Sequence, residues 1–256
     1  MAAERAEISE DAILGGRLIL RQPRNGHRVG HDAILLAAAT LARAGEQIID
    51  LGAGVGAAGL AVARRTEGVA VTLVEIDPAL AALASENAAR NALAERVRAV
   101  CLDVAAPAAV FAAAGLAPGA ADRVLMNPPF NAPQQQASPD PGRRLAHSAS
   151  RHTLDRWVGA AARLLQPAGV VTLIWRADAL ASLLAALTTG FGAVTLLPIH
   201  PKPGVAAIRV LARAVKASRS PLSLLPGFIL ADEAGKPTAE AEAVLRGGAL
   251  LPLARD

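Results

Sequence analysis

The sequence predicts an α/β protein whose mostly parallel sheet ends in an antiparallel hairpin. From residue 47 onward, short runs rich in Val, Ile and Leu alternate with longer Ala- and Leu-rich helical patterns, an order typical of βαβ units. Only a turn-rich connector at 199–204 separates the last two strands, which is too short for a crossover helix and favours antiparallel pairing. With 256 residues and 53% hydrophobic content, the chain is long enough for one domain with a full core.

The predicted elements follow one another in a regular order. A short polar lead and a turn at Gly15-Gly16 precede a strand at 17–22 and an apolar helix that Asp32 is expected to cap. Seven strands are then expected near 47–51, 70–76, 97–101, 122–126, 169–175, 193–198 and 206–212, with helices near 56–65, 78–91, 105–114, 153–166 and 177–188. The polar segment 131–152 has three prolines and no periodicity, so we expect a long functional or disordered loop there.

Composition narrows the classes of function. A sequence pI of about 10.1 and a net charge of +4 permit contact with a polyanion. Aromatic residues make up 2% of the chain and Tyr is absent, which argues against a multi-base stacking platform. The single cysteine, Cys101, excludes an internal disulfide framework and an all-Cys zinc site. The sequence has neither a basic leader before an apolar stretch nor a long uncharged apolar run, so we expect a cytoplasmic protein without a signal peptide or membrane span.

A glycine-rich loop follows the first strand of the sheet, in the run Asp50-Leu51-Gly52-Ala53-Gly54-Val55-Gly56. Its glycines allow a sharp turn and let a ligand approach the backbone closely. The pattern G-x-G-x-x-G is also satisfied from Gly54 to Gly59, so an NAD-dependent oxidoreductase has to be considered. However, the Asp50 carboxylate would repel a pyrophosphate, whereas it would attract the ammonium and sulfonium groups of S-adenosylmethionine.

Two further acids end the second and third strands. Glu75, about 25 residues beyond the start of the glycine loop, can accept hydrogen bonds from both ribose hydroxyls of an adenosine. Asp77, just after it, is expected to cap the next helix. Beyond the third strand, the Asp103 carboxylate can accept from an adenine amine and the backbone amide of Val104 can meet a ring nitrogen. Alternatively, Asp103 could cap a helix that begins near Ala105.

The fourth strand ends in Asn127-Pro128-Pro129-Phe130, the most specific motif of the chain. Each proline fixes its own φ and pushes the preceding residue toward extended backbone, so Asn127 and Pro128 are held rigidly at the sheet edge. If the Asn127 side-chain oxygen and the Pro128 carbonyl each accept one N–H of an exocyclic amine, the conjugated lone pair is localised toward a methyl donor. Phe130 would stack on the planar substrate. This chemistry requires no metal.

At these residues the sequence resembles the class I methyltransferase superfamily, and within it the amino-methyltransferases with an Asn-Pro-Pro-aromatic motif. It is similar to bacterial tRNA N6-adenosine methyltransferases that act on a valine tRNA, also at 21–36 and from His200 to Lys216. The resemblance implies a Rossmann-like, seven-stranded sheet, S-adenosylmethionine bound by 50–56, Glu75 and Asp103, and catalysis at 127–130. It also implies that Arg28 lines the cofactor pocket. We expect an N-terminal lead and cofactor-covering helix (1–46) and a methyltransferase domain (47–256) within one compact domain.

Basic residues flank the expected substrate entrance. Arg143, Arg144 and Arg151 follow the Asn-Pro-Pro-Phe motif, and Lys202 lies in the final hairpin. Such charges would position RNA phosphates without reading sequence, although solvated surface charge would also account for them. Together with the resemblance, these charges lead us to expect RNA as the partner. Our first expectation is tRNA as the substrate and N6-methyladenosine as the product.

Other functions stay open at this stage. A protein-glutamine methyltransferase uses the same motif on a side-chain amide, but that family has a helical domain ahead of the cofactor loop, a pattern that residues 1–46 lack. A guanine-N2 rRNA methyltransferase has a similar motif and often a second methyltransferase-like domain. A non-catalytic RNA-binding protein on this fold would be expected to have lost Asp50, Glu75 or Asn127, and all three are present.

Overall fold

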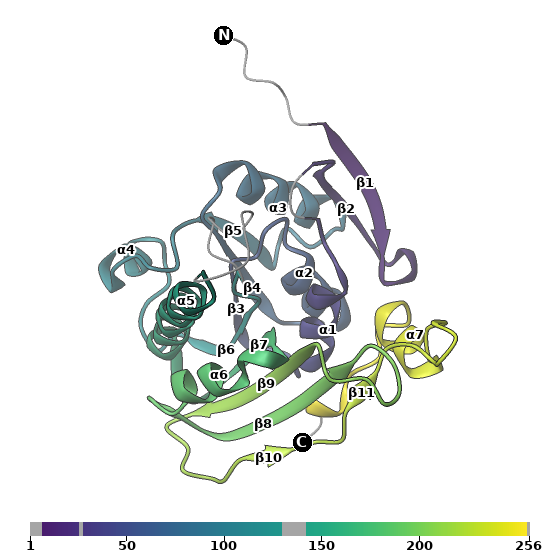
Figure 1. Cartoon of the computed structure of the whole chain (residues 1–256). Coiled ribbons are helices and arrows are strands. Elements are labelled where there is room, and N and C mark those ends of the chain that lie inside the picture. The colour runs from purple at the N-terminus through teal and green to yellow at the C-terminus, as the bar shows by residue number, and fades with distance from the viewer. Residues whose placement is uncertain (1–6, 26–27, 130–141, 255–256) are drawn as a thin grey trace.

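The computed structural model describes residues 7–25, 28–129 and 142–254, with side chains described from residue 152 onward in the last of these ranges. Within them, the chain folds around a nine-stranded sheet (Figure 1). Its strands are β3 (Gln47–Leu51), β4 (Ala70–Glu75), β5 (Val97–Cys101), β6 (Ala121–Met126), β7 (Leu165–Arg176), β8 (Phe191–His200), β9 (Arg209–Lys216), β10 (Ser223–Leu224) and β11 (Phe228–Ile229). β1 (Ile8–Ile13) and β2 (Leu18–Pro23) form a separate two-stranded ribbon.

The strand order β10-β8-β9-β7-β6-β3-β4-β5, with β11 also paired to β8, contains two kinds of pairing. The strands β5, β4, β3, β6 and β7 are parallel, whereas β9 is antiparallel to both β7 and β8. The register sets Leu51 of β3 opposite Val74 of β4 and Met126 of β6, so these three strands end at one edge of the sheet. The prediction of a mostly parallel sheet that ends in an antiparallel hairpin is confirmed.

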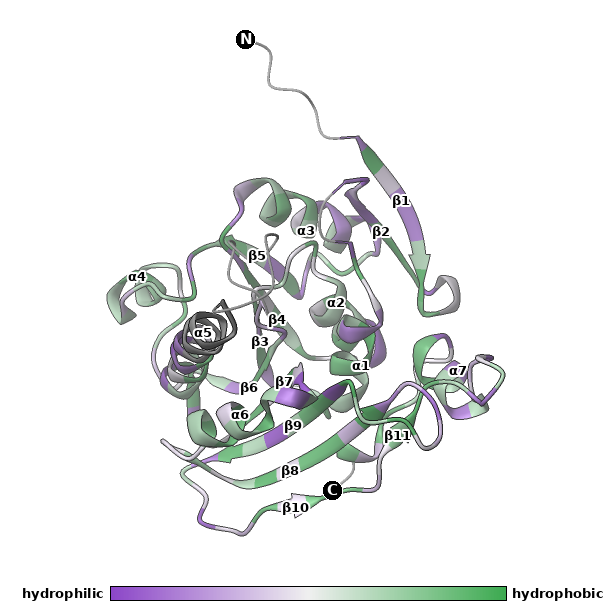
Figure 2. Ribbon diagram, in the orientation of Figure 1, coloured by the Kyte–Doolittle hydropathy of each residue, from purple (hydrophilic) through white to green (hydrophobic). Residues whose placement is uncertain are grey.

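Helices cover both faces of the sheet (Figure 1). On one face lie α1 (His31–Ala39), α2 (Ala57–Arg65) and α3 (Pro78–Arg90), and on the other lie α4 (Ala108–Ala113), α5 (Gly142–Leu164) and α6 (Leu180–Leu187). A hydrophobic core lies on each face of the sheet. Successive residues of β4 point to opposite faces, so Leu73 packs into one core and Val74 into the other. Burial on both faces explains the largely apolar runs of the central strands, which are green along much of their length in Figure 2. In the described part of the chain, no helix is both long and apolar enough to cross a membrane.

The structure contains several elements that the sequence did not predict. β10 and β11, of two residues each, extend the expected seven-stranded sheet to nine strands by pairing in parallel with β8. β1 pairs antiparallel with β2, the strand expected at 17–22, and α7 (Ala239–Leu245) lies near the C-terminus. Helix α5 begins at residue 142 rather than 153, so the end of the expected 131–152 loop is helical.

The two capping predictions have opposite outcomes. Asp77 caps α3 as expected, because its carboxylate accepts hydrogen bonds from two backbone amides of the first turn. The prediction for Asp32 was wrong, since α1 starts one residue earlier, at His31, and has Gly30 at the N-cap. The Asp32 carboxylate instead accepts a hydrogen bond from Arg209 Nε of β9 at 2.9 Å. This ion pair joins the start of α1 to the final hairpin.

Candidate active site

The glycine loop joins β3 to α2 at the carboxyl edge of the sheet. Gly52, Gly54 and Gly56 have φ angles of 69°, 57° and 91°, in the left-handed region that favours glycine. A Cβ at Gly52 would lie 2.2 Å from Cη2 of Trp157 in α5, whereas a Cβ at Gly54 would meet no atom of the described residues within 4 Å. An aromatic ring therefore closes the loop at Gly52, and the backbone is open to a ligand at Gly54.

Two buried acids border this loop. Asp50 is 2% exposed, and its Oδ2 accepts a hydrogen bond from Gly59 N at 2.8 Å. Glu75 is 7% exposed, and its two oxygens accept from Gly54 N at 2.8 Å and from Asp77 N at 2.9 Å. Burial raises the pKa of Asp50 to about 7; the hydrogen bond from Gly59 opposes this rise, and the charge of Glu75 adds to it. A cationic ligand beside Asp50 would therefore favour its ionised form.

The residue after β6 has a buried side-chain acceptor. Asn127 directly follows β6, and its Oδ1 is buried without a hydrogen-bond partner among the described residues. Leaving a buried polar group unpaired costs about 1–3 kcal/mol. Pro128, next to it, is buried, and Pro129 is exposed. Phe130, the expected stacking residue, lies outside the described residues. An amine that donated to Asn127 Oδ1 would remove this cost.

The third predicted acid lies just beyond β5. Leu102 N donates to Glu75 O at 2.8 Å, which holds the end of β5 against β4. Asp103 is exposed and accepts a hydrogen bond from Ala105 N at 2.8 Å, and Val104 is buried. Because α4 begins only at residue 108, Asp103 shapes a turn here and does not cap that helix. Asp103 and Val104 therefore lie near Glu75, because Leu102, the residue before them, is hydrogen-bonded to the Glu75 carbonyl.

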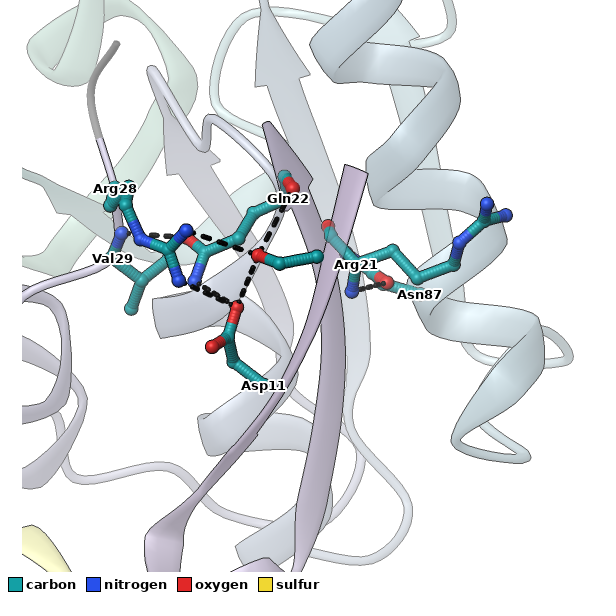
Figure 3. Close-up of polar contacts among 7 residues, drawn as sticks. Asp11, Arg21, Gln22, Arg28, Val29 and Asn87 are labelled. Carbon is teal, nitrogen blue, oxygen red and sulfur yellow. Dashed lines mark hydrogen bonds and ion pairs between the residues drawn. The ribbon is translucent and has the colours of Figure 1, made fainter. Parts of the chain in front are cut away.

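Arg28 contacts the N-terminal ribbon (Figure 3). Its guanidinium donates to Asp11 Oδ2 at 2.8 Å and to Ser9 Oγ at 3.1 Å. The Gln22 side chain donates to the same Asp11 oxygen and accepts from Val29 N. The pKa of Asp11 is held below its usual range mainly by the hydrogen bond from Gln22 and then by the one from Ser9. Arg28 makes a smaller contribution. These contacts fasten the chain where it leaves β2, and the expected place of Arg28 in the cofactor pocket stays a prediction.

Sequence reasoning missed Asn87, which joins the ribbon to the glycine loop. Asn87 of α3 is fully buried, and its Oδ1 accepts from Arg21 N at 2.7 Å (Figure 3). Its Nδ2 donates to Arg21 O and Val55 O at 3.0 Å each. One turn later, Asn91 binds Ile19 in the same way, at 3.0 Å to its N–H and 2.8 Å to its carbonyl. Two asparagines four residues apart in an Ala-rich helical pattern are the one signal that could have indicated this contact.

The residues predicted to contact RNA are only partly described. Arg143, Arg144 and Arg151 belong to α5, but their side chains lie outside the described residues. Lys202 follows β8, which runs in the same direction as β6 and β7, so it leaves the sheet at the edge where Asn127 lies. Its Nζ donates to Glu233 O at 3.2 Å. The RNA-binding roles of these four residues stay predictions.

The residues at this edge fit S-adenosylmethionine. Leu51 and Met126 lie opposite each other, so Asn127 and the glycine loop are neighbours. The ammonium and sulfonium groups of that cofactor suit an edge with two buried carboxylates better than a pyrophosphate does. Glu75 already accepts two backbone hydrogen bonds, and a carboxylate can accept about four, so two ribose hydroxyls can also be accommodated.

The fold and this edge define a class I S-adenosylmethionine-dependent methyltransferase. The model of the methyltransferase small domain family matches residues 28–206, and the chain belongs to that family. The protein is therefore an S-adenosylmethionine-dependent methyltransferase, as the sequence predicted.

Several curated relatives have the same name, tRNA1(Val) (adenine(37)-N6)-methyltransferase. The relative from Tolumonas auensis is 31% identical over 170 residues, which cover 66% of this chain and 68% of that protein. The relative from Phocaeicola vulgatus is 31% identical over 189 residues, or 72% of this chain and 75% of that protein. The alignment with the Enterobacter relative, at 34% identity, spans about half of each protein, 52% in both cases.

Solved structures share the fold. A predicted O-methyltransferase from Agrobacterium tumefaciens superposes with a TM-score of 0.73 at 30% identity, over 86% of this chain and 98% of that one. A 16S rRNA N2 methyltransferase from Thermus thermophilus, solved with AdoMet and guanosine, has a TM-score of 0.57 at 23% identity, over 82% of this chain and 50% of that one. The second likeness concerns the fold alone.

Proposed function

We propose that this protein methylates the N6 amine of an adenine in tRNA. The observation that carries the proposal is the Oδ1 of Asn127 at the end of β6, beside the glycine loop, because this atom is buried and has no hydrogen-bond partner among the described residues. The curated relatives are named for this reaction, which supports adenine N6 as the acceptor and tRNA as the partner. A tRNA substrate also implies that the protein acts in the cytoplasm.

In this reaction, Asn127 and Pro128 orient the acceptor amine. The Asn127 Oδ1 accepts one N–H of the amine and the Pro128 carbonyl accepts the other, which reduces delocalisation of the nitrogen lone pair into the base. The following prolines restrict both residues, so the two acceptors are arranged before substrate binds. The cofactor supplies an electrophilic methyl group on a sulfonium. The methylated nitrogen then releases one proton to solvent, and Phe130 would hold the base by stacking.

We assign cofactor binding to the neighbouring strand ends. Asp50 would face the cationic methionine part, for which its raised pKa and burial make a positive partner favourable. Glu75 would accept the ribose hydroxyls, and Asp103 with Val104 N would bind the adenine edge. Gly52 and Gly56 would shape the turn of the loop, and Gly54 would let the cofactor approach the backbone. Arg28 and the other described residues of segment 1–46 would cover it.

We assign the approach of RNA to basic residues that follow the catalytic motif and to the final hairpin. Arg143, Arg144 and Arg151 in α5, and Lys202 after β8, would contact phosphates rather than base edges. Such contacts contribute affinity that falls with added salt. Lys202 Nζ donates to Glu233 O with one of its three N–H groups, so two remain for a phosphate.

O-methylation, the activity predicted for the Agrobacterium protein, is a second candidate. A hydroxyl group donates a single hydrogen bond, whereas an exocyclic amine donates two. The Asn127 Oδ1 and the Pro128 carbonyl make a pair of acceptors, which matches the amine. Guanine N2 is an amine as well, so analysis of the product has to separate it from adenine N6.

The test is methyl transfer from labelled S-adenosylmethionine to bulk unmodified tRNA, followed by digestion to nucleosides and mass analysis. We expect N6-methyladenosine, and a loss of at least about 100-fold in kcat for Asn127→Ala with cofactor affinity within twofold. Asp122→Asn is the matched control: it keeps the shape of a half-buried side chain in β6 that binds Gln47 N and Gln166 Nε2 away from the carboxyl end of the strand, and it should retain activity. A 2′-O-methyl or N2-methylguanosine product, or full activity in Asn127→Ala, would refute the proposal.

A further inference from the structure

Three arginines line a cavity beside α2. Arg17, in the turn between β1 and β2, and Arg64 and Arg65, in the last turn of α2, surround a cavity of about 240 Å³. α1 and the segment after α7 complete its wall. α2 spans nine residues from the glycine loop to this point, or about 12 Å along its axis, so the cavity is separate from the candidate active site.

None of the three guanidinium groups has a carboxylate partner within the described residues. Each instead donates to a backbone carbonyl: Arg17 to Gly247 O at 2.6 Å, Arg64 to Asn91 O at 2.6 Å, and Arg65 to Thr40 O at 2.7 Å. A guanidinium has five N–H donors, so each one retains donors for a further acceptor. Burial lowers the pKa of Arg65 to about 10, which agrees with a partly buried charge that has no counter-charge beside it.

The remaining wall of the cavity is apolar. It is formed by Leu14, Ile34, Ala37, Ala38, Ala61 and Val244, together with Gly248 and Ala249 after α7. A wall of this kind favours a ligand with hydrocarbon groups, because burying them removes apolar surface from water. A phosphodiester backbone would bring ribose hydroxyls and strongly hydrated phosphates against it, so RNA suits the cavity poorly. Positive charge and apolar surface together describe an amphipathic anion.

We propose that this cavity binds a small organic anion, with a carboxylate or phosphate head at the three arginines and a short apolar body against α1 and α2. The head would accept from guanidinium donors that the backbone carbonyls leave available, and would supply the counter-charge that Arg65 lacks. The site is independent of the proposed substrate, because none of the residues that line it belongs to the glycine loop or to the end of β6.

Isothermal titration calorimetry on the full chain tests this proposal. Hexanoate and hexyl phosphate are the probes, with hexan-1-ol and inorganic phosphate as matched controls that each lack one half of the ligand. We expect saturable binding of at least one probe, at least tenfold tighter than either control. The preference between the two heads identifies a carboxylate or a phosphate source.

Three variants connect binding to the cavity. Arg64→Gln should weaken binding of the preferred probe at least tenfold, and Ala38→Leu should abolish it by filling the apolar wall. Arg96→Gln is the matched control, because Arg96 also donates to a backbone carbonyl, Thr66 O at 2.8 Å, but does not line this cavity; it should bind within twofold of the unmodified protein.

Two results would overturn the proposal. One is the absence of saturable binding by either probe to protein that unfolds cooperatively. The other is binding that both Arg64→Gln and Ala38→Leu leave unchanged. If Arg64→Gln weakened tRNA binding while no probe bound, the arginines would serve as a phosphodiester contact, which also contradicts a cavity for small anions.

Discussion

Replacing Asn87 with alanine is expected to weaken cofactor binding about fivefold, whereas replacing Asn91 should leave it nearly unchanged. Each asparagine makes three side-chain hydrogen bonds, and each binds the backbone of β2 through two of them. They differ in the third bond: Asn87 Nδ2 donates to Val55 O of the glycine loop, and Asn91 Nδ2 donates to Asn87 O within α3. Comparing Asn87→Ala with Asn91→Ala therefore separates the effect of anchoring the ribbon from the effect of anchoring the glycine loop.

The magnitudes follow from these contacts. At about 1 kcal/mol for each hydrogen bond, less about 0.5 kcal/mol for the better helix propensity of alanine, either variant should lower the free energy of unfolding by about 2–3 kcal/mol. Only Asn87→Ala frees the glycine loop, and restoring its order on binding should cost about 1 kcal/mol more. A cost of that size raises the Kd for S-adenosylmethionine by roughly fivefold.

Urea unfolding and calorimetric titration with S-adenosylmethionine measure the two quantities. Similar losses of stability in both variants, with a weaker Kd in Asn87→Ala alone, would support the reasoning. If both variants bound the cofactor as tightly as the unmodified protein, or if both weakened it equally, then the bond from Asn87 to Val55 would not organise the loop. The double variant should lose less stability than the sum, because both asparagines hold the same strand, β2, and loss of one already loosens the contact that the other makes.

Three further predictions concern other parts of the structure. Asp50 titrates near 3.8 when unfolded and near 7 when folded, so its protonated form stabilises the fold at low pH and this contribution is lost as pH rises through 7. Urea unfolding without cofactor should therefore show a fall in stability between pH 4 and 7 that Asp50→Asn lacks, by up to about 4 kcal/mol; parallel pH profiles would contradict this. Gly52→Ala should destabilise the protein by at least about 2 kcal/mol more than Gly54→Ala, since only the former meets Trp157, and should shift tryptophan fluorescence. In a double-mutant cycle, Asp32→Ala and Arg209→Ala should show a coupling of about 1 kcal/mol; a coupling of zero would mean that this part-buried ion pair does not fasten α1.

The central sheet could be predicted because its strands are buried on both faces. Val-, Ile- and Leu-rich runs such as 47–51 and 70–75 are bounded by Gly, Pro and Asp, which mark their ends even without an alternating pattern. Residues that directly follow a parallel strand are also expected at the carboxyl edge of the sheet, where ligands bind. For the same reason Asp50, Glu75 and Asn127 could be selected as candidates before their neighbours in space were known.

The elements that escaped prediction depend on contacts distant in the chain. β1 has the sequence Ile-Ser-Glu-Asp-Ala-Ile, whose acids and single serine give no strong strand signal until β2 pairs with it. β10 and β11 have two residues each, which is too short for any periodicity. Asp32 looked like a helix cap because nothing nearby in sequence announces its partner, Arg209, 177 residues away. The packing of Trp157 on Gly52 is likewise a tertiary contact.

The paired asparagines have a further consequence for how the molecule behaves in a crowded solution. An isolated two-stranded ribbon has two open edges, and each could recruit a strand from another molecule. On the outer edge of β2, however, Ile19 and Arg21 have both their N–H and C=O groups occupied by Asn91 and Asn87. The remaining edge belongs to β1, whose Glu10 pairs with Arg90 of α3 at 3.0 Å and whose neighbour Asp11 is charged as well. Helix α3 thus protects the β2 edge of the ribbon from intermolecular strand addition, and the charges on β1 disfavour it at the other edge.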